Sequence, residues 1–266
     1  MTRLEMGFSP CPNDTFAFHA MLHGLVDTGG YRFSSHIHDV ELLNSMAGEK
    51  KLHVTKLSFF GYLTLKQHYT LLGSGAALGF GCGPLVVGAS GEVNLKKARI
   101  AVPGRLTTAN LLLHLWQPEV SNIIYTRFDN ILPGIQNGEF DAGVIIHEGR
   151  FVFENYNCRK IIDLGQWWEE ETHLPIPLGC MAIRNDMATE ERKTNVETII
   201  SRSVRFAHEH PETSRSFVKS HAQEMEDAVI NAHIRLYVNA FTEKMGPEGE
   251  KAIQTLEEMA RCRNLL

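Results

Sequence analysis

The sequence predicts an α/β protein with two lobes, and three observations carry that prediction. Short apolar segments alternate with segments of helical periodicity up to about residue 184, a pattern typical of sheets covered by helices. Beyond that point only helical patterns remain. Two strongly apolar stretches, PLVVG at 84–88 and PIPLGCMAIR at 175–184, flank a middle block that has its own alternation of strands and helices. Two strands that cross around an inserted unit produce a hinged molecule with a cleft between its lobes.

The first elements follow from local patterns. LEMGF at 4–8 alternates apolar and other residues and stops at SPCPND, which predicts a strand and then a helix capped near Asn13 or Asp14. The glycine-rich segment 73–83 fits no nucleotide-binding motif, so we expect a tight loop at the cleft or the hinge. The other elements expected in this part are strands at 32–40 and 53–57 and helices at 41–49 and 59–67.

The middle block and the C-terminal part differ in their hydrophobic patterns. In TNVETIISRSVRFA at 194–207, five apolar residues fall on one face at helical spacing, and the segments 226–241 and 248–263 behave similarly. Because strands and helices alternate before residue 184, we expect mainly parallel sheets. The elements expected in the middle block are strands at 84–88, 99–102, 123–126, 142–146 and 160–164 and helices at 111–116 and 131–138.

Composition excludes several classes of protein. The 26 basic and 31 acidic residues give a net charge of −5 without any run of lysines or arginines, so nucleic acid is not an expected partner. The first residues lack the apolar region of a signal peptide, and no window approaches the ~18 apolar residues that cross a bilayer. We therefore expect a cytoplasmic protein with no membrane partner.

The cysteines and histidines indicate neither a disulfide framework nor a metal site. The five cysteines are widely spaced with no C-x-x-C motif, which favours reduced thiols. The pairs His36 with His38 and His208 with His210 lack a nearby third ligand. The prediction is a protein without a bound metal and without an organic cofactor.

Polar residues follow four of the predicted strands. In an open parallel sheet, ligands bind at the carboxyl ends of the strands, so these residues together predict a polar cleft. They are Ser9, Asn13 and Asp14 after the first strand, Thr55, Lys56 and Ser58 at the third, Thr107 and Thr108 after 99–102, and His147 and Glu148 after 142–146.

Most of these residues also have a purely structural interpretation. Asn13 and Asp14 are residue types that cap helices. Lys56 can be a solvated edge charge, although its apolar neighbours favour a side chain directed to a cleft. Thr107 and Thr108 can cap the following helix, but two hydroxyls beside free helix N–H groups favour binding of a carboxylate or phosphate.

The stretch GVIIHEGR at 143–150 is the most informative, because an apolar strand ends abruptly in His147 and Glu148. An imidazole with an ordinary pKa of ~6.5 can accept and return protons near neutrality, so His147 is the candidate general base. The alternative is a histidine that is solvated or satisfied in the core. Glu148 either raises the pKa of His147 or serves as a second acid, unless the two adjacent side chains point apart.

Several long motifs occur in one order along the chain: GFSPCPNDTF at 7–16, DVELLN at 39–44, VTKLSF at 54–59, SGAALGFGCGPLVV at 74–87, VPGRLTTA at 102–109 and VIIHEGRF at 144–151. Together they resemble a known family, the 1,4-dihydroxy-6-naphthoate synthases of the futalosine pathway of menaquinone biosynthesis. The resemblance continues through DLGQWWEEETHLPIPLG at 163–179, AHEHPE and YVNAFT, and so covers essentially the whole chain.

The resemblance implies a fold like that of type II periplasmic solute-binding proteins, with two hinge strands and a helical C-terminal region. We expect a large discontinuous α/β domain at 1–90 plus 180–266 and a smaller inserted α/β domain at 91–179. The implied activity is a lyase without metal or organic cofactor that converts cyclic dehypoxanthine futalosine into 1,4-dihydroxy-6-naphthoate and a ribose-derived fragment.

The resemblance also implies roles for individual residues. His147 would be the proton acceptor, and the expected ligand is a small-molecule carboxylate. The residues that would hold it are Lys56, Leu57, Ser58, Thr107 and Thr108, to which the strand-end argument adds Ser9 and Asn13.

Two alternatives share the predicted fold. A non-catalytic protein that binds small organic acids needs the same cleft but no base. The chorismate dehydratase of the same pathway also needs an anion site. Naphthoate formation or chorismate consumption distinguishes the three. The helical C-terminal third offers a surface for a homodimer.

Overall fold

The structure is a computed structural model that describes residues 2–89, 91–223 and 226–266, and its strands form two separate sheets. The first sheet contains, in spatial order, β2 (Tyr31–Ile37), β1 (Thr2–Phe8), β3 (Val54–Ser58), β11 (Ile176–Arg184) and β4 (Tyr69–Leu71), and β5 (Ala77–Gly79) also pairs with β11. The second sheet contains, in spatial order, β10 (Cys158–Asp163), β6 (Leu85–Ala89), β9 (Ala142–Ile145), β7 (Ile100–Val102) and β8 (Ile123–Tyr125).

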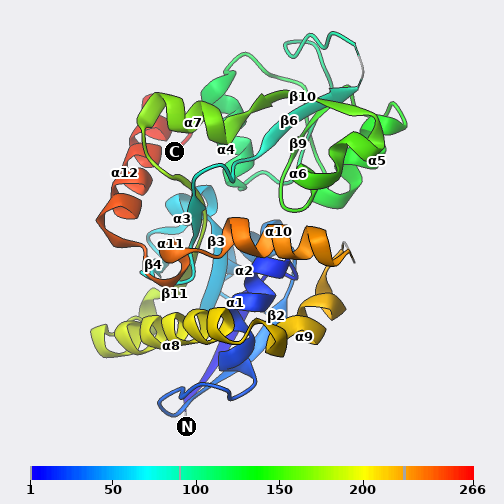
Figure 1. Ribbon diagram of the computed structural model, residues 1–266. Helices are drawn as coiled ribbons and strands as arrows, with labels where there is room; N and C mark the ends of the chain where they lie inside the picture. Colours follow the sequence, from blue (N-terminus) through cyan, green and yellow to red (C-terminus); the bar gives the residue numbers. More distant parts are fainter. Residues whose placement is uncertain (1, 90, 224–225) are drawn as a thin grey trace.

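The second sheet is formed entirely by residues that lie, in sequence, between β5 and β11 of the first sheet. Figure 1 shows the two sheets as separate halves, with the second sheet and α7 at the top and the first sheet with α8 at the bottom. The division into 1–90 plus 180–266 and 91–179 stays a prediction, and residue 90 lies outside the described residues.

The expectation of mainly parallel sheets is wrong. β1 is parallel to β2 and β3, and β7 is parallel to β8 and β9, but β11 is antiparallel to its partners β3, β4 and β5, and β6 is antiparallel to β9 and β10. The reason is the double crossing of the chain. β6 and β11 each begin beside the cleft just after the chain has changed sheets, whereas β1, β3, β7 and β9 all end there. The carboxyl ends of these four strands therefore meet at the cleft, as expected.

Helices cover the two sheets. Those that precede β11 are α1 (Pro12–Leu22), α2 (Val40–Gly48), α3 (Phe59–Leu65), α4 (Thr108–Trp116), α5 (Ile131–Gln136), α6 (Gly149–Val152) and α7 (Leu164–Thr172). Those that follow β11 are α8 (Glu190–Glu209), α9 (Arg215–His221), α10 (Asp227–Tyr237), α11 (Ala240–Glu243) and α12 (Gly246–Cys262). Short 3-10 turns lie at η1 (Phe128–Asn130), η2 (Phe153–Tyr156), η3 (Asn185–Met187) and η4 (Pro211–Ser214).

The predicted helical character of the C-terminal part is confirmed for the described residues. The apolar face expected in α8 is buried against α1, in a cluster with β1 and β3. Several segments differ from the prediction: 226–241 forms two helices, α10 and α11, and the glycine-rich segment 73–83 contains the short strand β5. The elements β4, α6 and α7 lie where no such element was expected. Hydrophobic periodicity does not reveal the bends of the chain between α10 and α11 and around β5.

The first crossing of the chain touches the start of α7. A Cβ atom on Gly83, in the connection before β6, would lie 2.2 Å from Cα of Gly165, at the start of α7. Only glycine permits this approach of two backbones. On the same side of the molecule, α12 packs on both α4 and β11, and its buried Leu256 belongs to an apolar cluster that continues from one half into the other. The halves therefore share one continuous contact along this side.

None of the helices in the described ranges has the length and apolar character needed to span a bilayer.

Candidate active site

A cavity of about 80 Å³ lies between the two sheets, at the carboxyl ends of β1, β3, β7 and β9. A buried water needs roughly 10–15 Å³, so the cavity has room for a small group of atoms even in this compact arrangement. All eight residues predicted to form the site line it, namely Ser9, Asn13, Lys56, Leu57, Ser58, Thr107, Thr108 and His147. The strand-end argument therefore located the cleft, while the role of each residue in it stays a prediction.

A buried ion pair forms the floor of the cavity. Nζ of Lys56 donates a hydrogen bond to Oδ1 of Asp14 at 2.8 Å and to the carbonyl oxygen of Gly75 at 3.2 Å. Only 7% of the Lys56 side chain and 2% of the Asp14 side chain is exposed. The solvated-edge interpretation of Lys56 is thus excluded, because β3 lies between β1 and β11 and directs the ammonium group inward.

Asp14 does not cap α1, and neither does Asn13. The N-cap is Cys11, with Pro12 as the first helical residue, and no side chain accepts from the helix N–H groups there. Pro12 supplies a fixed φ and lacks an N–H, so the helix begins two or three residues earlier than expected. Asp14 instead accepts hydrogen bonds from N and Oγ of Ser9, from Nδ2 of Asn13 and from Lys56.

Thr107 and Thr108 begin helix α4 on the other side of the cavity. Thr107 is the N-cap, since its Oγ1 accepts from the N–H of Asn110 at 3.2 Å. Thr108 donates its hydroxyl to the carbonyl oxygen of Leu178 at 2.7 Å and accepts from the N–H of Phe60. The Thr108 hydroxyl therefore ties α4 to the first sheet. The N–H groups of the first turn have no carbonyl acceptors within the helix, and their role as the anion-binding element stays a prediction.

His147 follows β9 with a left-handed backbone, φ 55°. This conformation is uncommon for a residue other than glycine, and it turns the chain sharply into α6 at the end of the strand. The imidazole of His147 packs edge-to-face with the ring of Phe128, with 5.2 Å between the ring centroids. The ring of His233 lies nearly parallel to it, with 6.2 Å between the centroids. One side of it remains open to the cavity.

The surroundings of His147 keep the imidazole neutral. Burial lowers the pKa of His147 to about 4, and the Asp14 carboxylate opposes that shift while Lys56 adds to it. At neutral pH the imidazole is therefore unprotonated and able to accept a proton.

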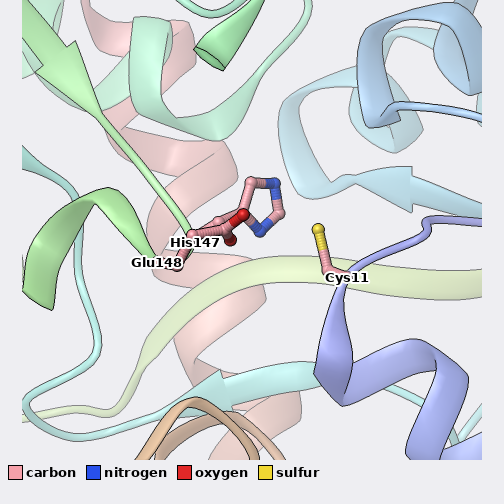
Figure 2. A group of neighbouring side chains, drawn as sticks. All are labelled: Cys11, His147 and Glu148. Carbon is pink, nitrogen blue, oxygen red and sulfur yellow. The ribbon is translucent and has the colours of Figure 1, made fainter. Parts of the chain in front are cut away.

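Glu148 and Cys11 lie beside this ring, as Figure 2 shows, with the sulfur of Cys11 facing the imidazole from the start of α1. One potential ligand atom from each of Cys11, His147 and Glu148 lies within 4.8 Å of the others. Cysteine binds metals as a thiolate. Burial raises the pKa of the Cys11 thiol well above its ordinary range. We assign no metal ion to this group, and the expected absence of a metal stays a prediction.

Sequence reasoning missed two residues of α10. Tyr237 lines the cavity, and burial raises the pKa of its hydroxyl well above the ordinary value. His233 is 1% exposed, and its Nε2 lies 3.0 Å from Oδ1 of Asn13. The YVNAFT motif contained Tyr237, but no pattern in the sequence set His233 apart from a core residue of an amphipathic helix.

Two further polar residues, from α2, hold the site in place. Asn44 donates to Oγ of Ser58 and accepts from its N–H. Both carboxylate oxygens of Glu41 lie 3.2 Å from the N–H of Leu106, in the loop that leads to Thr107. Glu41 therefore bridges the cleft from the half of the first sheet to the half of the second. Both residues lie in or beside the DVELLN motif.

Comparison with known proteins places this cleft in a family. The family model described as menaquinone biosynthesis matches residues 4–262. The chain belongs to the menaquinone biosynthesis family. The 1,4-dihydroxy-6-naphthoate synthase of Thermus thermophilus is 44% identical, over 100% of this chain and 96% of the relative. The synthase of Streptomyces coelicolor is 40% identical, over 99% and 94%. The predicted resemblance is thereby confirmed.

Solved structures confirm the predicted fold class for this family member. A protein of Archaeoglobus fulgidus has a TM-score of 0.93 at 35% identity, over 99% of this chain and 98% of that one. A Candida albicans protein that exhibits the generic periplasmic binding protein fold has a TM-score of 0.70 at 11% identity, over 100% and 91%. The family member therefore has the periplasmic-binding-protein fold.

Proposed function

We propose that this chain is a carbon–carbon lyase that converts cyclic dehypoxanthine futalosine into 1,4-dihydroxy-6-naphthoate and a ribose-derived fragment, without metal or organic cofactor. Membership of the family and the names of its relatives support the product. The observation that carries the proposal is a neutral imidazole, His147, that faces the same cavity as the N-terminus of α4.

In the proposed reaction, His147 takes the proton from the carbon next to the ketone of the spiro-fused ring, and the electron pair left behind forms an enolate. The enolate expels the sugar-derived fragment by cleavage of a carbon–carbon bond, driven by aromatisation of the ring. The electron pair of the broken bond leaves with the fragment, which takes up the proton held by His147 and so returns the imidazole to its neutral form. Thr107, Thr108 and the α4 N–H groups would hold the substrate carboxylate, so that a weak base is correctly oriented. A closed cleft excludes water from the enolate.

The test is replacement of His147 by Asn, with formation of the naphthoate and binding of the cyclic substrate measured separately. A general base contributes about 10²–10⁴ in rate, so turnover should fall at least hundredfold while the dissociation constant changes little. His114→Asn is the control, because that histidine lies on α4 with its Nδ1 hydrogen-bonded within the helix, away from this cavity.

Three other results would replace the proposal. Substantial residual turnover by His147→Asn removes the histidine from its role. Consumption of chorismate by the natural chain indicates the related dehydratase. Binding of an organic acid without turnover of either substrate indicates a binding protein.

A further inference from the structure

His233 joins the two sides of the active-site wall. It lies in α10, 220 positions after Asn13 in the sequence, and contacts Asn13 through Nε2. Its other ring nitrogen, Nδ1, lies 3.9 Å from Oε2 of Glu148. Both side chains are almost fully buried, His233 at 1% and Glu148 at 8% exposed. A buried imidazole placed between an amide and a carboxyl group must have a defined tautomer, and the surrounding contacts specify which one.

The tautomer follows from Asp14. Asp14 accepts four hydrogen bonds and pairs with the ammonium group of Lys56, so it is a carboxylate and can only accept. The Asn13 atom that faces Asp14 at 2.8 Å is therefore the amide nitrogen, and the amide oxygen faces His233. It follows that Nε2 of His233 carries a proton and donates to Asn13.

The other nitrogen of His233 then carries a lone pair. Burial lowers the pKa of His233 well below its ordinary value, and the neighbouring His147 lowers it further, so the ring is neutral. A neutral imidazole with its proton on Nε2 has an acceptor at Nδ1. No hydrogen-bond donor reaches Nδ1 among the described residues. An ionised Glu148 has only acceptor oxygens, so it would repel the lone pair on Nδ1. A protonated Glu148 carboxyl group would instead donate a hydrogen bond to Nδ1.

We propose that His233 is a positioning residue that accepts a hydrogen bond from a protonated Glu148, so that Glu148 stands beside His147 as a neutral carboxylic acid. The separation of 3.9 Å exceeds the usual ~2.5–3.2 Å of a hydrogen bond, so the proposal requires the carboxyl group of Glu148 to lie about 1 Å closer to His233. The titratable groups beside Glu148 include Cys11 from α1, His147 next to it, and His233 and Tyr237 from α10. Arg150 pairs with Asp163 and donates to the carbonyl oxygen of Gly83.

This inference rests on the proposed function for its consequence. The substrate is an organic acid and the intermediate an enolate, so an ionised carboxylate beside His147 would repel both. A neutral acid at the same place fills the wall without that repulsion. His233 thus acts through Glu148, and Asn13 acts through His233 by fixing its tautomer.

Two spectroscopic measurements on the full chain test the protonation states directly. Infrared difference spectra of the natural chain and Glu148→Gln at neutral pH should contain the band of a protonated carboxyl group, assigned to Glu148. Nitrogen NMR of histidine-labelled protein, with His233→Gln to assign the resonance, should show His233 as neutral with its proton on Nε2. A missing acid band, an imidazolium, or a proton on Nδ1 overturns the proposal.

Kinetic measurements with the cyclic substrate provide a second test. The amide of Glu148→Gln is neutral and can donate to Nδ1, so kcat should stay within about tenfold, whereas Glu148→Ala and His233→Leu should lose more than tenfold in kcat with KM little changed. His233→Gln, which retains a donor and an acceptor, should recover part of the loss. The exposed Glu154→Gln is the matched control. Equal inactivity of Glu148→Gln and Glu148→Ala overturns the proposal, because it shows that the carboxylate is required.

The two kinds of measurement separate this inference from the proposed function. The spectra need no substrate. An acid band in a protein that forms no naphthoate refutes the proposed function and supports the positioning role, whereas turnover without the acid band does the reverse.

Discussion

His147 combines two unusual properties at a single position. Its backbone is left-handed, and its imidazole has a strongly lowered pKa because the ring is enclosed by the cleft. The backbone conformation results from placement of a short turn directly after a buried strand. The sequence alone predicted the position of His147, because an apolar run stops there. It did not predict the pKa, because that depends on residues such as Phe128 and His233 that are remote in the chain.

The lowered pKa has a direct consequence for the pH dependence of catalysis. A base is active when unprotonated, so kcat/KM should be retained as the pH falls through 6.5 and be lost only near the pKa of about 4. The measurement is a pH profile of kcat/KM between pH 3.5 and 8, within the range where circular dichroism shows the fold intact. An acid limb near 6.5 would contradict the enclosed environment of His147.

The ion pair of Lys56 and Asp14 should be important for stability as well as for the cleft. Lys56→Met leaves a buried carboxylate without its cation, and breakage of a buried pair costs about 3–5 kcal/mol. Urea unfolding should show that loss, and Lys56→Met combined with Asp14→Asn should recover part of it. Lys96→Met, in the exposed pair with Glu119, should cost less than about 1 kcal/mol. Equal losses in the buried and exposed pairs would be incompatible with this assignment.

At the scale of the elements, long periodic segments were predictable and short ones were not. The apolar face of α8 and the strands β1 and β9 follow from their patterns, whereas β4 and β5 have three residues each and no alternation to detect. The direction of β6 and β11 depends on where the chain changes sheets, which periodicity does not encode. The sequence also did not reveal that α10 contributes to the site, because His233 has an ordinary core position in that helix.

The contact between Gly83, in the first crossing, and Gly165, at the start of α7, gives a prediction about stability. In Gly83→Ala, the new methyl group would lie 2.2 Å from the backbone of Gly165, and neither backbone can move without displacing a sheet or a helix. The free energy of unfolding should fall by about 1–3 kcal/mol or more. Gly48→Ala is the control, since no atom lies within 4 Å of a Cβ there and its change should stay within ~0.5 kcal/mol. If Gly83→Ala were as stable as the natural chain, the close approach of the backbones at Gly83 and Gly165 would be excluded.

At the scale of the molecule, the cleft is held closed from two directions. On one side α12 packs across both halves, and at the cleft itself Glu41 reaches from α2 to the loop before α4. The fold of two halves around a cleft was predictable because apolar stretches flank a block with its own alternation. The contacts that close the cleft were not, since Glu41 looks like any solvated helix residue in the sequence.

Removal of the Glu41 carboxylate should open the cleft. In Glu41→Ala the N–H of Leu106 loses both acceptor oxygens, so small-angle X-ray scattering of the unliganded protein should give a larger radius of gyration, and KM should rise. Saturating ligand should restore the compact form. Glu49→Ala, at the exposed end of the same helix, should leave the scattering unchanged. Superimposable curves for Glu41→Ala and the natural chain would show that Glu41 does not contribute to closure.

The order of these parts along the chain bears on biosynthesis. His147 and the threonines of α4 are translated long before α10, which carries His233 and Tyr237, and before α12, which packs on both halves. Domains form from the N-terminus onward as the polypeptide emerges from the ribosome. A nascent chain thus contains His147 while one wall of the pocket is still missing, and the pocket is enclosed only after the last helices have docked.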